Sequence, residues 1–92
     1  MVHKIAPDAQ IILYGSRARG DAELDSDYDL LVLVKQPLTR QLDKDICYTL
    51  YDLERETDTV ICIQIYEQAE WLSPKLQVTP FVINVEREGI LI

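Results

Sequence analysis

The stretch Gly15–Leu30, GSRARGDAELDSDYDL, joins a turn after an apolar segment to two aspartates that stand two positions apart. The preceding apolar residues 11–14, IILY, stop at Gly15 and Ser16, a pattern typical of a buried strand that turns into a helix. Glycine lets the backbone come close to a ligand, and the amides at a helix start point toward an anion. The first half of the stretch therefore predicts a phosphate-binding turn.

The side chains of this turn suit a polyphosphate. The Ser16 hydroxyl can donate a hydrogen bond to a phosphate oxygen, and the guanidinium groups of Arg17 and Arg19 can neutralise phosphate charge. Gly15, Ser16, Arg17 and Arg19 are thus the candidate nucleotide-binding residues. The alternative is that Ser16 is only a helix N-cap and that both arginines are solvated, because a Gly-Ser pair is common in proteins.

Two carboxylates open the next apolar segment, DYDLLVLV. Side chains alternate along a strand, so Asp27 and Asp29 share one face, with Cα atoms about 7 Å apart. Tyr28 and Leu30 take the opposite face. Carboxylates at the end of an apolar strand are costly unless a cation or hydrogen bonds compensate them, and such hard oxygen ligands suit magnesium or manganese. The alternative is a solvated strand end that follows an acid-rich loop.

The spacing of glycine, serine, ten residues and two aspartates separated by one residue resembles the signature of the DNA polymerase beta-like nucleotidyltransferase superfamily. Within it, GSRARG and SDYDLLV look most like the minimal nucleotidyltransferases, which are commonly encoded beside a HEPN-domain partner. The resemblance implies an α/β fold: a small mixed β-sheet flanked by helices, like the palm of these enzymes. At 92 residues, the chain is expected to form a single domain over residues 1–92.

The resemblance also implies a third carboxylate on a later strand, and Asp58, at the start of the β-rich run TDTVICIQIY, matches it. Asp27, Asp29 and Asp58 would then be both the metal ligands and the catalytic residues. Two magnesium ions, about 4 Å apart, would bind the triphosphate and the attacking oxygen. Asp58 would also help to deprotonate the acceptor hydroxyl. The alternative for Asp58 is an aspartate that caps a loop before the strand.

For function, the resemblance implies transfer of AMP from ATP to a protein hydroxyl on a HEPN toxin, which this chain would neutralise as an antitoxin. One alternative is an antitoxin that acts by binding alone. Another is a transferase for a small molecule, although larger relatives hold such acceptors with extra modules for which 92 residues leave no room. The net charge of −7 argues against a nucleic-acid partner, because an acidic surface repels phosphates. A basic or neutral protein partner fits better.

The cysteines and the hydropathy pattern predict a cytoplasmic protein. Cys47 and Cys62 do not form a CxxC pair and are expected to be reduced. No apolar run approaches ~18 residues, and Pro7 interrupts the N-terminal segment before one forms. We therefore expect no association with a membrane.

The order of elements follows from local patterns. A short helix at 16–19 is expected between the first two strands, 11–14 and 28–34. Apolar residues at helical spacing from Leu38 to Leu53 predict an amphipathic helix. The segments expected after it are a strand at 59–66, one or two helical turns at 67–72 stopped by Ser73 and Pro74, and a helix at 81–87 with Thr79 as N-cap and Gly89 as its end.

The chain departs from the family before the first strand. Minimal nucleotidyltransferases usually carry a longer helix there, packed on the sheet, and few residues precede Ile11. Either the chain begins late, or a partner or a second copy of the chain covers the open sheet face, because an open face would expose a large apolar patch.

Overall fold

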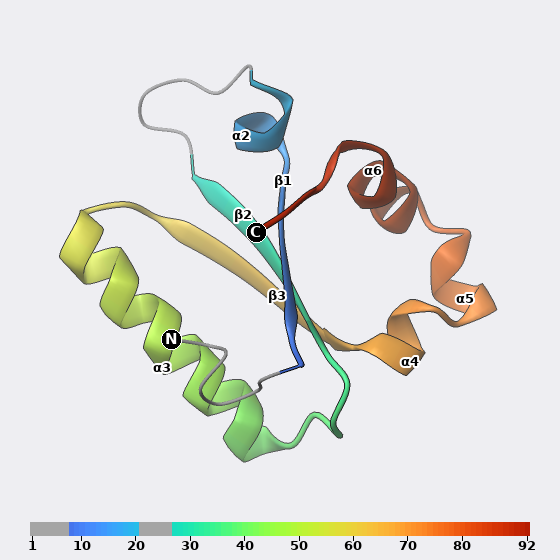
Figure 1. Ribbon diagram of the computed structural model, residues 1–92, viewed down its shortest axis with the longest axis horizontal. Helices are drawn as coiled ribbons and strands as arrows, with labels where there is room; N and C mark the ends of the chain where they lie inside the picture. The colour runs from blue at the N-terminus through green and yellow to red at the C-terminus, as the bar shows by residue number, and fades with distance from the viewer. Residues whose placement is uncertain (1–7, 21–26) are drawn as a thin grey trace.

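The computed structural model describes residues 8–20 and 27–92, which form a four-stranded sheet with helices on both faces (Figure 1). In chain order the strands are β1 (Gln10–Tyr14), β2 (Tyr28–Val34), β3 (Ile61–Glu67) and β4 (Ile90–Leu91). The order in the sheet is β3-β2-β1-β4, with β2 parallel to β3 and β1 antiparallel to both of its neighbours. The predicted α/β fold with a mixed sheet is confirmed. The acid-rich loop before Asp27 and the N-terminal segment with Pro7 lie outside the described residues.

The helices divide between the two faces of the sheet. The short α2 (Ser16–Arg19) follows β1, and the long α3 (Arg40–Thr57) covers one face. The other face is covered by α4 (Gln68–Trp71), α5 (Pro74–Gln77) and α6 (Pro80–Glu88). Figure 1 shows α3 on one side of the strands and the helices α4, α5 and α6 on the other.

β2 is buried on both faces, which explains why its sequence is apolar without interruption. One set of its side chains faces α3, and the apolar cluster there comprises Leu30, Val32, Val34, Leu42, Ile46 and Leu50. The alternate set faces α4–α6, in a second cluster with Leu31, Leu33, Trp71, Val82 and Val85. The register of β2 is therefore fixed from both sides, because a shift by one residue would exchange the two sets.

α3 confirms the amphipathic pattern and extends it. Thr39 is its N-cap and accepts a hydrogen bond from the amide of Leu42 at 3.1 Å. The helix continues past Leu53 to Thr57 and ends at Asp58, whose left-handed conformation (φ 53°, ψ 41°) closes the last turn. The strand predicted from residue 59 is thus wrong at its start: β3 begins at Ile61, because the helix cap takes up the residues before it.

Two further elements differ from the expectation. Pro74 was expected to stop the preceding helical turns, and it also begins α5, since proline is well suited to the first position of a helix. β4 follows Gly89 and was not predicted, because two apolar residues carry no alternation signal. α6 behaves as expected, with Thr79 accepting from the amide of Val82 and Gly89 ending the helix.

Neither cysteine is in a disulfide: Cys47 is partly buried and Cys62 is exposed. Within the described ranges, none of the helices has the length and apolar character needed to cross a membrane.

We predict that Ile46→Ala lowers the free energy of unfolding by about 2 to 5 kcal/mol, because it leaves a cavity between α3 and the sheet. Ile46 is fully buried, whereas Tyr48 on the same helix is 59% exposed. The control Tyr48→Ala should change stability by less than about 0.5 kcal/mol. Equilibrium urea unfolding measures both, and equal costs would contradict the packing of α3 on the sheet.

Candidate active site

The turn between β1 and α2 depends on Gly15. Its backbone (φ 77°, ψ −155°) lies in a region that only glycine adopts readily. Its carbonyl accepts hydrogen bonds from the amides of Ala18 and Arg19 at 3.1 and 3.0 Å. A Cβ atom at Gly15 would clash with Oδ2 of Asp29. The turn is therefore packed directly against the Asp29 carboxylate.

Ser16 is the first residue of α2, and Gly15 is the N-cap. The alternative interpretation of Ser16 as an N-cap is therefore wrong, because a residue inside the first turn does not cap it. Ser16 directly follows Gly15, which meets Asp29. The predicted hydrogen bond from the Ser16 hydroxyl to a phosphate stays a prediction.

Asp27 and Asp29 are brought together at the end of β2. In the sheet, Asp29 lies opposite Tyr14 of β1 and Cys62 of β3. It alternates with Leu30, which faces α3, so Asp29 is on the α4–α6 face. Burial and the neighbouring charge of Asp27 raise the pKa of Asp29, and the nearby Arg19 partly offsets this rise. The two carboxylates thus repel each other in the absence of a cation.

Asp27 and Asp29 fit a magnesium ion. In nucleotide sites this ion is commonly bound by one or two carboxylates, and waters and substrate phosphates complete its shell. The chemistry of the donor set supports the fit, because both groups are carboxylates and a cation beside them would relieve their repulsion.

Cys62 stands beside this pair, in a contact that the sequence analysis missed. Its Sγ lies 3.6 Å from Oδ2 of Asp27. Burial, followed by the hydrogen bond to Asp27 and its charge, raises the pKa of the Cys62 thiol, which therefore stays protonated. Only the register of the parallel β2–β3 pair could have revealed this neighbour, and register is not readable from either strand alone.

Asp58, the predicted third carboxylate, is the left-handed cap of α3, where its amide donates to the carbonyl of Glu54. Among residues 8–20 and 27–92, no three His, Cys, Asp or Glu side chains gather in an arrangement that could hold a metal ion. The structure therefore does not bring Asp58 together with Asp27 and Asp29. Its role as a ligand and base stays a prediction.

The two arginines of α2 take different sides of the sheet. The guanidinium carbon of Arg17 lies 4.5 Å from the ring centre of Tyr28, whose side chain is on the α3 face. Arg19 is on the Asp29 side, and its Nη1 lies 3.2 Å from Oε2 of Glu88 on α6. Arg19 is therefore the better placed of the two to meet a phosphate beside Asp29, and a phosphate contact from Arg17 stays a prediction.

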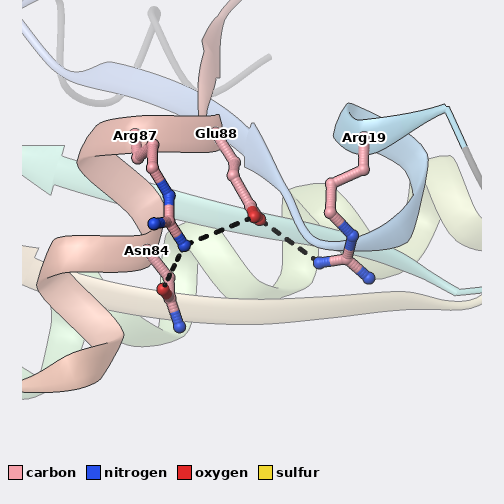
Figure 2. A network of polar contacts seen from close by, with 4 residues as sticks. All are labelled: Arg19, Asn84, Arg87 and Glu88. Carbon is pink, nitrogen blue, oxygen red and sulfur yellow. Dashed lines mark hydrogen bonds and ion pairs between the residues drawn. The ribbon is translucent and has the colours of Figure 1, made fainter.

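The C-terminal end of α6 completes this side of the site (Figure 2). Glu88 also lies 3.9 Å from Nη2 of Arg87, which donates to Oδ1 of Asn84 at 3.2 Å. Figure 2 shows Glu88 between Arg87 and Arg19, with Asn84 next to Arg87. Sequence reasoning did not assign Asn84, Arg87 or Glu88 to a site, because nothing local indicates that α6 meets α2.

Two hollows lie on opposite faces of the sheet. One, of about 360 Å³, opens between α2 and α6, and Tyr14, Gly15, Phe81 and the Figure 2 side chains line it. The other, of about 290 Å³, is on the α3 face and is mostly apolar; its lining includes Leu13, Tyr28, Leu30, Leu53, Ile61 and Ile92. Only the first lies on the same face as Asp29.

We predict that Gly15→Ala weakens the binding of ATP with magnesium about ten- to a hundredfold, because the added methyl group displaces the Asp29 carboxylate. Gly20→Ala is a matched control: Gly20 also has a positive φ (81°), but nothing lies within 4 Å of its would-be Cβ. Both variants should lose about 1 to 3 kcal/mol of stability from backbone strain. Calorimetric titration measures binding, and equal binding by the two variants would contradict the contact.

A second prediction follows from the pKa of Asp29, which is higher in the folded chain than the ordinary value of 3.8. Ionised Asp29 therefore costs stability at neutral pH, and this cost disappears as the pH falls through the raised pKa and below 3.8. In chelator, Asp29→Asn should unfold at higher urea than wild type at pH 7, with a shrinking difference at lower pH. Asp8→Asn, at an exposed position, is the control. If the stability difference between Asp29→Asn and wild type stays constant with pH, the raised pKa of Asp29 is not its cause.

Comparison with known proteins shows the family of the chain. The sequence model of the nucleotidyltransferase domain family matches residues 2–92. A Methanocaldococcus jannaschii protein named "putative protein adenylyltransferase" is 33% identical over 81 residues, which cover 88% of this chain and 75% of that protein. The fold is similar to that of a chain from a toxin–antitoxin crystal structure with AMP-PNP (TM-score 0.58, 19% identity), covering 98% of this chain and 64% of that chain, just under two thirds of its length. Since the family match spans nearly every residue, the chain belongs to the nucleotidyltransferase domain family.

Proposed function

We propose that this chain is a cytoplasmic protein adenylyltransferase that moves AMP from ATP to a hydroxyl of a HEPN toxin and thereby acts as its antitoxin. The observation that carries the proposal is the packing of the Gly15 turn against Asp29, with Asp27 beside it, in a nucleotidyltransferase domain. The name of the Methanocaldococcus jannaschii relative supports a protein acceptor. The fold shared with a chain from a toxin–antitoxin crystal structure supports the proposed pairing with a toxin.

In the proposed reaction, the acceptor hydroxyl oxygen attacks the α-phosphorus of ATP. A new phosphorus–oxygen bond forms, the bond from the α-phosphorus to the bridging oxygen breaks, and pyrophosphate leaves. The hydroxyl proton passes to a carboxylate of the site. Ser16 and Arg19 hold the phosphates by hydrogen bonds and charge, with Arg17 contributing from the other side of the turn.

Asp27 and Asp29 would hold magnesium, which would neutralise the phosphates and stabilise the leaving pyrophosphate. The protein's own part is to hold Asp29 near the start of a buried strand, with Asp27 directly before that strand. Because β2 is buried from both sides beyond Asp29, the backbone of Asp29 cannot shift without disturbing the core. The site is thus preorganised by packing.

The net charge of −7 supports a basic or neutral protein partner rather than a nucleic acid. An acidic domain attracts a basic partner at long range and speeds their encounter, an effect that salt weakens.

A second candidate function is neutralisation of the partner by binding alone. One observation favours it: within the described part of the chain, no third carboxylate joins Asp27 and Asp29 in a metal-binding group, and Cys62 stands in register with Asp29 instead. A domain that keeps the fold but transfers no nucleotide would tolerate such a site.

We predict that Asp27→Asn combined with Asp29→Asn abolishes nucleotide transfer but leaves the fold and partner binding intact, because asparagine has nearly the same shape and carries no charge. The measurement is mass spectrometry of a HEPN partner incubated with the chain, ATP and magnesium, which should show an added AMP for wild type only. Asp43→Asn combined with Asp52→Asn makes the same charge change at exposed positions of α3 and should stay active.

Cell survival separates the two candidate functions. If the Asp27→Asn and Asp29→Asn variant protects cells from the toxin as well as wild type does, modification is dispensable and the binding-only function holds. If it binds the partner without protecting cells, transfer is the protective step.

A further inference from the structure

The hollow between α2 and α6 adjoins the acidic site. Two of the residues that line it, Tyr14 and Gly15, also meet Asp29: Tyr14 is its partner in the sheet, and Gly15 packs against its carboxylate. A nucleotide whose phosphates lie beside the Gly15 turn and Asp29 would therefore have the hollow next to it. At about 360 Å³, the hollow lies in the range of small-molecule sites.

One wall of the hollow is aromatic. Tyr14 and Phe81 meet edge to face, with ring centres 5.5 Å apart, and Phe81 meets Trp71 in the same manner at 5.8 Å. Trp71 is buried and its indole nitrogen donates to Glu86 at 3.0 Å, so Phe81 packs against an anchored ring. A fixed aromatic surface suits the flat, apolar face of a base.

The opposite rim is polar and carries both signs of charge. Glu88 lies between the guanidinium groups of Arg19 and Arg87 (Figure 2). Its carboxylate partly neutralises them and would repel a further phosphate at this place. A carboxylate is, however, a good acceptor for ribose hydroxyls, as in dinucleotide-binding folds. The rim thus suits a neutral, hydroxyl-bearing group better than a second anion.

Asn84 adds a hydrogen-bonding group at the rim. Its Oδ1 accepts from Arg87, which orients the amide and leaves its NH2 group to donate. Ring nitrogens and exocyclic oxygens of bases are acceptors for such a donor. The hollow therefore combines an aromatic surface, a carboxylate acceptor and an amide donor within one small space.

From this combination we infer that the hollow between α2 and α6 is the nucleoside subsite: the base contacts Phe81 and accepts a hydrogen bond from Asn84, and the ribose hydroxyls donate to Glu88. The inference rests on the proposed nucleotide transfer, and it assigns to α6 a binding role beyond packing. The phosphates are held by α2 and β2, while the nucleoside is held by α6.

The test compares ATP with inorganic tripolyphosphate, which carries the phosphates without the nucleoside. Calorimetric titration of the full chain with magnesium should show ATP binding at least about tenfold tighter, since the nucleoside adds several contacts. Asn84→Ala should weaken ATP about three- to tenfold and leave tripolyphosphate unchanged. Phe81→Leu, which keeps an apolar side chain, should lower the preference for ATP in the same way.

The matched control is Ile83→Ala, on the same helix at a position that is 50% exposed and outside the hollow. It should leave both ligands unaffected. If ATP and tripolyphosphate bind equally tightly, or if Asn84→Ala leaves their ratio unchanged, the nucleoside subsite is refuted while the phosphate site stands. If neither ligand binds, the proposed nucleotide transfer fails and the subsite fails with it.

Discussion

The burial of β2 between two helical layers is the constraint on which the rest of this structure depends. Its even-numbered side chains from Leu30 to Val34 are held by α3, and Leu31 and Leu33 are held by α4–α6. This double burial fixes the strand in register and direction, and so fixes where its exposed end places Asp27 and Asp29. The two carboxylates repel each other, and the buried strand that follows them keeps them close.

Much of the fold could be predicted because its signals are local. The apolar run of β2, the helical spacing within α3 and the Thr79–Pro80 start of α6 each lie within one element, and each was found where expected. The first half of the site is also local, since Gly15 lies in the turn after β1 and the two aspartates lie at the start of β2. β4, by contrast, is two residues long, and only its pairing with β1 defines it as a strand.

The rest of the site depends on contacts between distant segments. Cys62 meets Asp27 because β2 and β3 pair in one particular parallel register. Asp58 is drawn away from the strand because α3 continues to Thr57 and needs a left-handed cap. The meeting of Arg19 with Glu88 joins residues 69 positions apart. Sequence patterns within one element carry no information on such meetings, so these three features could not be predicted.

The distance along the chain between the two halves of the site affects how the domain is made. α2 is synthesised early, but its partner α6 and the strand β4 beside β1 come from residues 80–91. Chains emerge from the ribosome N-terminal end first, at about 5–20 residues per second, and domains generally fold as units. A nascent chain that has released only β1–β3 therefore has the Gly15 turn and both aspartates, but it lacks α6 and the second neighbour of β1. The site closes only when the last elements have been released, which keeps incomplete chains from acquiring the finished site.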